Sequence, residues 1–358
     1  MMRVRTATFS DLEAMRDVSV RNGLSTFDPD EMRLWLQSHP FRAEFADVPF
    51  GWVLESAPDG IVGSHFNIPM MYELEGKRFR CVSGGSWGVD LAHRNASLLL
   101  GTTYFNQKGI DMLVSGSISE VAAKLMPVFR AKRIPSENYD LGYFWILRRQ
   151  SFAAAALRKK KVPAAALLSY PAAVALWAED LCNAGRRKNA SRVRRLTQFG
   201  KEFDSFWEKL RQGPGRLRAV RTSAVLEWRF GTGIRQNSTV ALGLFRSQEV
   251  LGYIVLRAKT REHLGLRQFL IADLQALEDS PEVLLELLSA ALSVTREQNL
   301  DVLEWRGWNP AKRQLACMLR PKSYRYPVWP LYAKAFNPAL ASLLTCPEKW
   351  DFSPFDAF

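Results

Sequence analysis

The chain has 358 residues, a formal net charge of +13, 47% hydrophobic residues and 24% charged residues. This length suits two domains, and the composition excludes a disordered or collagen-like chain. Four widely spaced cysteines without a Cys-x-x-Cys pair exclude a disulfide scaffold, and the histidines lack metal-binding spacing, so no metal site is expected. The first residues contain no apolar stretch typical of a secretory signal, so we expect a bacterial cytoplasmic protein with free thiols.

The first 150 residues predict a mixed sheet covered by helices, beginning with a strand at 2–8. Ser10-Asp11-Leu12-Glu13 has the pattern of a capping box, and Asp28 followed by Pro29 is typical of a second helix start. The remaining strands are expected at 50–55, 60–68, 78–89, 111–116 and 143–147, and the remaining helices at 95–107 and 119–129.

Residues 220–358 repeat this order. Strands are expected at 240–245, 250–257, 267–274 and 301–305, helices at 282–298 and 310–319, and an extended segment at 326–332. Gly63 and Asp111 in the first half align with Gly252 and Asp301 in the second half, at nearly the same spacing. A repeat of this size predicts two copies of one α/β (α+β) domain, each a mixed sheet flanked by helices.

The entire excess of positive charge lies between Arg148 and Arg221, and the rest of the chain is neutral. We therefore expect domains at 1–150 and 196–358 joined by a basic helical linker at 151–195. This segment is either a solvated connector or a platform for an anion, such as an acidic membrane surface, a nucleic acid or a phosphorylated donor. The apolar run at 162–178 is at the lower limit of length for a membrane span.

The order of elements resembles the fold of the GCN5-related N-acetyltransferases (GNAT). The segment 5–11 resembles the first strand of that fold entering its first helix, and Gly60-Ile61-Val62-Gly63 resembles its second hairpin. The chain looks like a tandem member of the kind associated with bacterial exopolysaccharide biosynthesis. The resemblance implies two GNAT-like domains, each with a mixed, mostly antiparallel sheet.

In that family, a strand with a bulge is followed by Arg/Gln-x-x-Gly-x-Gly/Ala and a helix. Backbone N–H groups and the helix dipole there attract the pyrophosphate of coenzyme A. Here Arg94 takes the leading position, while Ser97 and Leu99 replace the small residues. The resemblance implies that acetyl-CoA or another acyl-CoA contacts Val89, His93, Arg94, Asn95, Ala96 and Ser97. The corresponding stretch of the second half, 273–282, is acidic and lacks the signature, so we expect that half to have lost cofactor binding.

The catalytic groups are also implied by the resemblance. The oxyanion donor of the family is a backbone N–H beside the bulge, which indicates Gly88 or Val89. The usual general acid is a tyrosine in the helix after the fifth strand, but the helix expected at 119–129 contains none. The candidates nearby are Ser115, Ser117, Ser119, Glu120 and Tyr139, and we take Glu120 and Tyr139 as the predicted catalytic side chains.

Three functions remain open from the sequence. The leading one is an acyl-CoA-dependent N- or O-acyltransferase that acts on a sugar or a glycan-biosynthesis intermediate. The eroded signature and the basic middle segment favour a Fem-like aminoacyl-tRNA-dependent transferase as the alternative. The third is an inactive GNAT-like adaptor that binds an anionic membrane surface through residues 158–195 and is peripheral to the inner membrane.

Overall fold

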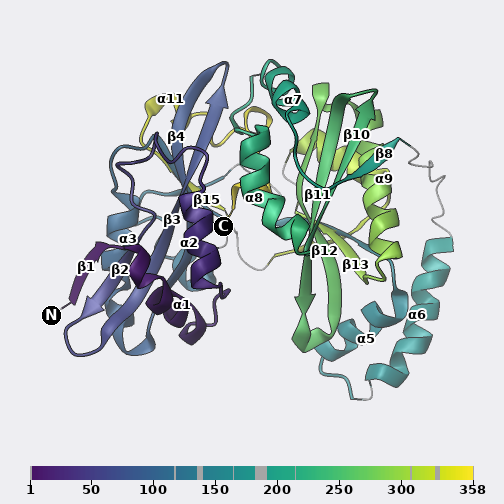
Figure 1. Cartoon of the computed structure of the whole chain (residues 1–358). Coiled ribbons are helices and arrows are strands. Elements are labelled where there is room, and N and C mark those ends of the chain that lie inside the picture. Colours follow the sequence, from purple (N-terminus) through teal and green to yellow (C-terminus); the bar gives the residue numbers. More distant parts are fainter. Residues whose placement is uncertain are drawn as a thin grey trace. The chain divides into compact units, whose positions relative to one another are not determined.

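The computed structural model describes residues 2–116, 118–134, 140–163, 165–181, 192–213, 215–306, 309–326 and 331–357. The chain divides into two compact units, each assembled from segments that are distant in sequence (Figure 1). Unit 1 takes Met1–Asp140, Gly215–Trp228 and Pro327–Phe358, and unit 2 takes Leu141–Pro214 and Arg229–Tyr326.

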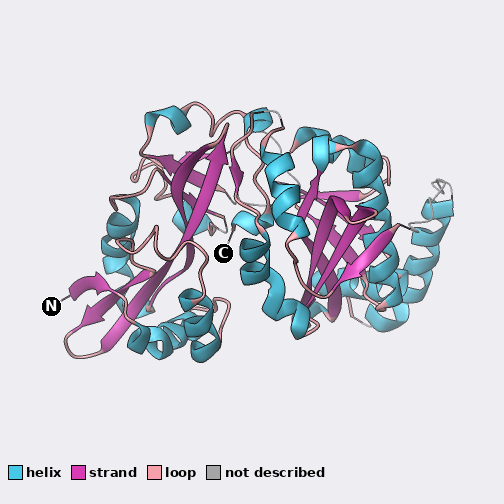
Figure 2. Ribbon diagram, turned by 45° about the horizontal axis from the view of Figure 1, so that its top comes forward, coloured by secondary structure: helices cyan, strands magenta, loops and turns pink. Residues whose placement is uncertain are grey.

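Unit 1 is a mixed sheet covered by helices on both faces (Figure 2). Its elements in chain order are β1 (Met2–Thr6), η1 (Phe9–Asp11), α1 (Leu12–Arg21), α2 (Pro29–Gln37), β2 (Gly51–Ser56), β3 (Gly60–Leu74), β4 (Lys77–Val89), η2 (Leu91–Ala96), α3 (Ser97–Phe105), β5 (Met112–Ser115), α4 (Glu120–Ala123), β6 (Lys132–Arg133), β9 (Arg218–Ala219), the start of α8 (Ser223–Arg235), β15 (Tyr332–Ala335), α11 (Pro338–Ala341), η5 (Pro347–Lys349) and η6 (Pro354–Asp356). The strands lie in the order β1-β2-β3-β4-β5-β15-β6, and β4 and β5 are parallel. Met15 of α1 packs against Phe66 on one face, and Tyr104 of α3 packs against Trp52 on the other.

Unit 2 is a second mixed sheet with helices. Its elements in chain order are β7 (Leu141–Ile146), α5 (Arg149–Lys159), α6 (Ala165–Leu181), β8 (Val193–Leu196), α7 (Glu202–Arg211), the end of α8, β10 (Thr239–Arg246), β11 (Glu249–Arg261), η3 (Glu262–Leu264), β12 (Leu266–Ala276), η4 (Leu277–Asp279), α9 (Pro281–Glu297), β13 (Val302–Trp305), α10 (Pro310–Cys317) and β14 (Lys322–Arg325). The strands lie in the order β8-β10-β11-β12-β13-β7-β14, with β12 and β13 parallel.

The two sheets have equivalent strand orders and one pair of parallel neighbours each, β4–β5 and β12–β13. The aspartates that the sequence aligns also make the same contact. Asp111, before β5, accepts the backbone N–H of Arg80, and Asp301, before β13, accepts that of Arg267, both at 2.8 Å. The predicted fold class, two mixed sheets flanked by helices, is therefore confirmed.

The pairing of the last strand in each half of the sequence differs from the prediction. Each of these two strands joins the sheet that is built mainly from the other half of the sequence. β7, expected at 143–147 to complete the first domain, pairs with β13 and β14 of unit 2. β15 pairs with β5 and β6 of unit 1. The continuous domains expected at 1–150 and 196–358 thus differ from the compact units. Local alternation predicts that a segment is a strand, but it does not encode which distant strand becomes its partner.

The helices expected to form a linker at 151–195 belong to unit 2 instead. α5 packs against η3 and β12, where Phe152 and Ala155 contact Leu264 and Val302. β8, which begins at Val193, pairs with β10 inside the sheet. Residues 182–191 of the expected linker lie outside the described residues. The apolar face of α5 explains the difference, because a helix with such a face buries it against the nearest sheet.

The start of the first helix also differs. Thr8, not Ser10, is the capping residue, and the Asp11 carboxylate accepts the backbone N–H of Thr8 at 2.7 Å. A hydrogen bond from Arg5 is the main reason that the pKa of Asp11 falls to about 2. The second helix starts as predicted, since the Asp28 side chain accepts two N–H groups of its first turn.

A buried ion pair anchors the C-terminal segment within unit 1. The Arg221 side chain is fully buried, donates to the carbonyl of Ala219 at 2.7 Å and lies 3.7 Å from the Asp356 carboxylate. Tyr72 of β3 donates to the same carboxylate at 3.0 Å, and the guanidinium lies over the Phe355 ring. The fold of unit 1 therefore depends on contacts between three separate stretches of the chain.

Replacing Arg221 by Met leaves the Asp356 carboxylate buried without its cation. We expect the free energy of unfolding to fall by about 3–5 kcal/mol, as measured by urea denaturation. Arg16 and Asp17 form an exposed ion pair in the same unit, so Arg16→Met is the matched control and should leave stability essentially unchanged. Equal losses in the two variants would contradict the account of this anchor.

Candidate functional site

The two parallel strands at the centre of unit 1 separate part of the way along. The pairing of β4 with β5 ends at Gly84 and Ser115, whereas β4 continues to Val89. A bulge lies in the continuing part, because Ser86 and Trp87 of β4 stand opposite a single residue, His65 of β3. Beyond the last pair, no strand among the described residues pairs with this edge of β4, and we call this unpaired stretch the opening.

The register of β3 and β4 distinguishes the two predicted oxyanion donors. The backbone N–H of Asp90 donates to the carbonyl of Val62 at 2.8 Å. Hydrogen-bonded and non-bonded pairs alternate along an antiparallel ladder, so the N–H of Gly88 points toward Ser64 of β3. The N–H of Val89 points away from β3, toward the edge that β5 has left.

The predicted cofactor-binding residues form one continuous turn between β4 and α3. The 3₁₀ helix η2 uses backbone N–H groups internally, as in the bonds from His93 to Asp90 and from Ser97 to Arg94. The side chains of Arg94 and Asn95 are exposed, whereas Ala96 is buried. The turn therefore offers an anion the exposed, cationic side chain of Arg94. At least two of its backbone N–H groups are already used in hydrogen bonds within the turn.

Close packing on α3 fixes the position of this turn. A Cβ atom at Gly101 would lie 2.5 Å from the Phe129 ring and 2.9 Å from the Trp87 ring, so only glycine allows this approach. Trp87 thus belongs to the core between β4 and α3, where its ring also packs near Phe105.

Four buried polar atoms surround the bulge without a hydrogen-bond partner in the part of the chain that the structure describes. They are Ser64 Oγ, His65 Nδ1, Ser83 Oγ and Trp87 Nε1. Such atoms are rare in folded proteins, and each is a candidate to bind water or a ligand. Ser64, His65 and Trp87 belong to the bulged part of the β3–β4 pair, beyond the last residue of β4 that pairs with β5, which makes the bulge the strongest candidate site in unit 1.

His65, at the bulge, was not predicted from the sequence as a site residue. Its ring lies 4.3 Å from the Tyr104 ring, and burial lowers its pKa to about 3, so it is neutral at neutral pH. A neutral imidazole here can donate or accept a hydrogen bond but does not supply positive charge. The available signal was the placement of His65 and Asn67 two positions apart in a mostly apolar strand, because this spacing puts both on one face.

Neither of the two residues predicted for proton transfer, Glu120 and Tyr139, is seen at the bulge. Glu120 is exposed at the start of α4, which ends at Ala123 and is much shorter than the helix expected at 119–129. Tyr139 lies outside the described residues. Next to β5, Gly116 contacts Ala357, so the C-terminal segment reaches the carboxyl end of that strand.

The equivalent opening in unit 2 is filled by a lysine. Pairing of β12 with β13 ends at Leu270 and Glu304, and β12 continues through a bulge. The amine of Lys312, from α10, donates to the carbonyl of Leu274 at 3.0 Å and to the Gln275 side chain at 3.1 Å. Lys312 is 2% exposed. Its side chain thus occupies a strand edge whose equivalent in unit 1 has no partner among the residues that the structure describes.

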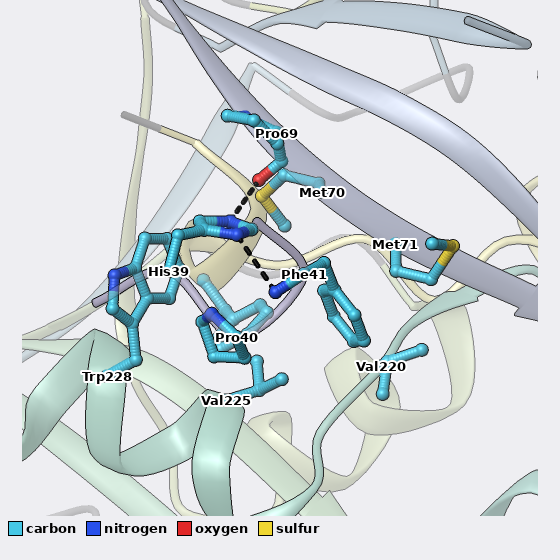
Figure 3. Close-up of a pocket in the computed structure, with 10 residues that line it drawn as sticks. His39, Pro40, Phe41, Pro69, Met70, Met71, Val220, Val225 and Trp228 are labelled. Carbon is cyan, nitrogen blue, oxygen red and sulfur yellow. Dashed lines mark hydrogen bonds between the residues drawn. The ribbon is translucent and has the colours of Figure 1, made fainter. Parts of the chain in front are cut away.

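Unit 1 also contains a small apolar pocket (Figure 3). Both ring nitrogens of His39 are bonded there, Nε2 to the carbonyl of Pro69 at 2.9 Å and Nδ1 to the N–H of Phe41 at 3.1 Å. Burial lowers the pKa of His39 to about 4. His39 is therefore a neutral structural residue, and its environment favours packing over catalysis. The pocket is lined by His39, Pro40, Phe41, Pro69, Met70, Met71, Val220, Val225, Trp228 and Phe355.

The buried histidine makes stability depend on pH. His39 is neutral in the folded state down to about pH 4, but in the unfolded chain it takes up a proton near pH 6.5. Its contribution of about 3 kcal/mol is thus present above pH 6.5 and is lost as the pH falls toward 4. Urea denaturation over this range should show a shallower pH dependence in His39→Gln than in the wild type. The exposed His263 provides the control, and an equal change in His263→Gln would contradict this assignment.

Among the described residues, no group of three or more His, Cys, Asp or Glu side chains is placed to hold a metal ion. No protein-family model and no curated protein sequence matches the chain.

Solved structures with little sequence identity share the fold. One is the Saccharomyces cerevisiae N-myristoyltransferase with bound myristoyl-CoA, with 12% identity, a TM-score of 0.56, and coverage of 100% of this chain and 85% of that chain. A GCN5-related N-acetyltransferase from Anabaena variabilis has 13% identity, a TM-score of 0.55, and coverage of 96% and 75%. One from Kribbella flavida has 12% identity, a TM-score of 0.51, and coverage of 96% and 74%. The GNAT-like fold predicted from the sequence is thereby confirmed.

Proposed function

We propose that the chain is an acyl-CoA-dependent acyltransferase whose donor site is the opening between β4 and β5 in unit 1. The observation that carries this proposal is the separation of the two strands at a bulge lined by unpartnered buried polar atoms. The similarity in fold to N-acetyltransferases and an N-myristoyltransferase supports it.

The residues at this opening fit an acyl-CoA. Bound acyl-CoA would supply a thioester whose carbonyl carbon is open to attack by an amine or hydroxyl. The N–H of Val89 faces the open edge and would stabilise negative charge on a carbonyl oxygen. Arg94, exposed at the turn before α3, would attract the phosphates. Glu120 and Tyr139 remain the candidates for proton transfer.

We assign donor binding to unit 1 and not to unit 2. Lys312 bonds to the free edge of β12 with its own amine, so a ligand would have to displace a buried, hydrogen-bonded cation. In unit 1, by contrast, no side chain of the described residues forms a hydrogen bond to the equivalent edge of β4 beyond Gly84. The acidic stretch after β12 further disfavours a phosphate there.

The acceptor that we propose is a small polar molecule or a glycan intermediate with a nucleophilic amine or hydroxyl. The hydroxyls of Ser64 and Ser83 support this choice, since both are buried beside the bulge without partners among the described residues. Hydroxyl groups at this position would suit the hydrogen-bonding groups of a sugar.

Titration calorimetry with acetyl-CoA tests the donor site. We expect Arg94→Glu to weaken binding by about 1–3 kcal/mol, roughly 5- to 150-fold, because it removes a charge-assisted contact with phosphate. Arg42 is another exposed arginine of unit 1, and Arg42→Glu makes the same charge change as a control. Equal affinity in the wild type and in Arg94→Glu would contradict the placement. If the wild type binds no acetyl-CoA but binds aminoacyl-tRNA, the donor is the tRNA instead.

A further inference from the structure

Exposed apolar side chains form a stripe over residues 167–174 of α6. Leu167, Tyr170 and Val174 are 74%, 61% and 63% exposed, and their spacing puts them on one face of the helix. On another face, Ala165 and Ser169 are buried. This part of α6 therefore has one buried side and one apolar side that faces solvent. An ordinary surface helix presents polar side chains to solvent instead.

The hairpin that carries this stripe is fixed to unit 2 through its first helix. α6 packs against α5, and α5 packs against η3 and β12 (Figure 1). Arg158, in the last turn of α5, donates to the carbonyl of Leu264 at 2.7 Å. The hairpin is thus held by α5, while Leu167, Tyr170 and Val174 on α6 contact little of the described chain.

Three lysines stand at the turn between the two helices. Lys159, Lys160 and Lys161 are exposed, and none of them forms an ion pair within the described residues. Lys161 has a φ of +56°, the left-handed conformation at the end of a helix that glycine adopts with less strain. The turn therefore places a cluster of unneutralised positive charge beside the start of the apolar stripe.

We propose that the α5–α6 hairpin docks on the surface of an anionic lipid bilayer, with the stripe in the interface and the lysines on the headgroups. The adjacency of exposed apolar side chains and cations is the pattern of helices that lie in the membrane interface. A nucleic acid would account for the lysines but not for the stripe. None of the helices that the structure describes is long and apolar enough to cross a bilayer, so this mode is adsorption to one leaflet. The proposal does not depend on the donor site in unit 1.

Flotation of the full chain with vesicles tests this proposal. One vesicle is phosphatidylcholine alone, and the other is phosphatidylcholine mixed with phosphatidylglycerol. We expect the wild type to float only with the anionic vesicles and to dissociate at high salt. Combining Lys159→Gln, Lys160→Gln and Lys161→Gln should weaken binding roughly hundredfold. Combining Leu167→Gln, Tyr170→Gln and Val174→Gln should weaken it by about tenfold or more.

A matched control removes the same charge elsewhere. Lys108, Lys124 and Lys201 are exposed and lie outside the hairpin, and their joint replacement by Gln should leave flotation unchanged. All the substituted side chains are exposed, so the variants should unfold at the wild-type temperature. The salt dependence of the wild type is a readout that needs no variant.

Three results would overturn the proposal. They are the absence of flotation by the wild type at low salt, unchanged flotation of either hairpin variant, and equal loss in the control. A gel shift with tRNA completes the test. If tRNA binds and the vesicles do not, the lysines form a nucleic-acid site and the membrane proposal is wrong.

Discussion

Parallel strands that separate within a sheet leave backbone polar groups that need another partner, and the two units of this chain meet that need differently. In unit 2, the buried amine of Lys312 bonds to the freed edge of β12. In unit 1, no described residue pairs with the edge of β4 beyond Gly84, and buried polar atoms at the bulge have no hydrogen-bond partner in the same part of the chain. Because such groups are costly to bury, a ligand at this edge would gain hydrogen bonds that the protein lacks.

The rest of unit 1 holds this opening in place. The glycine at position 101 brings α3 against Trp87 and so fixes the turn that carries Arg94. β15 arrives from the far end of the chain to pair with β5. The C-terminal segment that follows it is anchored by the buried Arg221 and reaches the carboxyl end of the same strand. The site therefore depends on three distant segments, which explains why a compact unit cannot be cut from the sequence as one piece.

Local signals in the sequence predicted the element order, the start of α2 and the positions of the central strands. The sequence did not predict that β7 pairs in the sheet of unit 2 and β15 in the sheet of unit 1, since neighbouring residues do not specify a distant strand partner. The turn at Arg94 was found through a family resemblance, but the roles of His65 and Lys312 were not. Each looks like an ordinary member of its strand or helix until the bulge and the opening are known. The concentration of positive charge was visible in the sequence, whereas the exposed stripe on α6 needed the packing of α5.

Hydrogen–deuterium exchange with and without saturating acetyl-CoA would locate the donor site, because it reports which backbone amides the ligand protects. We expect slower exchange over residues 85–97 of unit 1, where the N–H of Val89 faces the opening. We expect unchanged exchange over residues 270–276 of unit 2, where Lys312 occupies the edge. Protection confined to the second range, or none in either, would show that unit 1 does not bind the donor at the bulge.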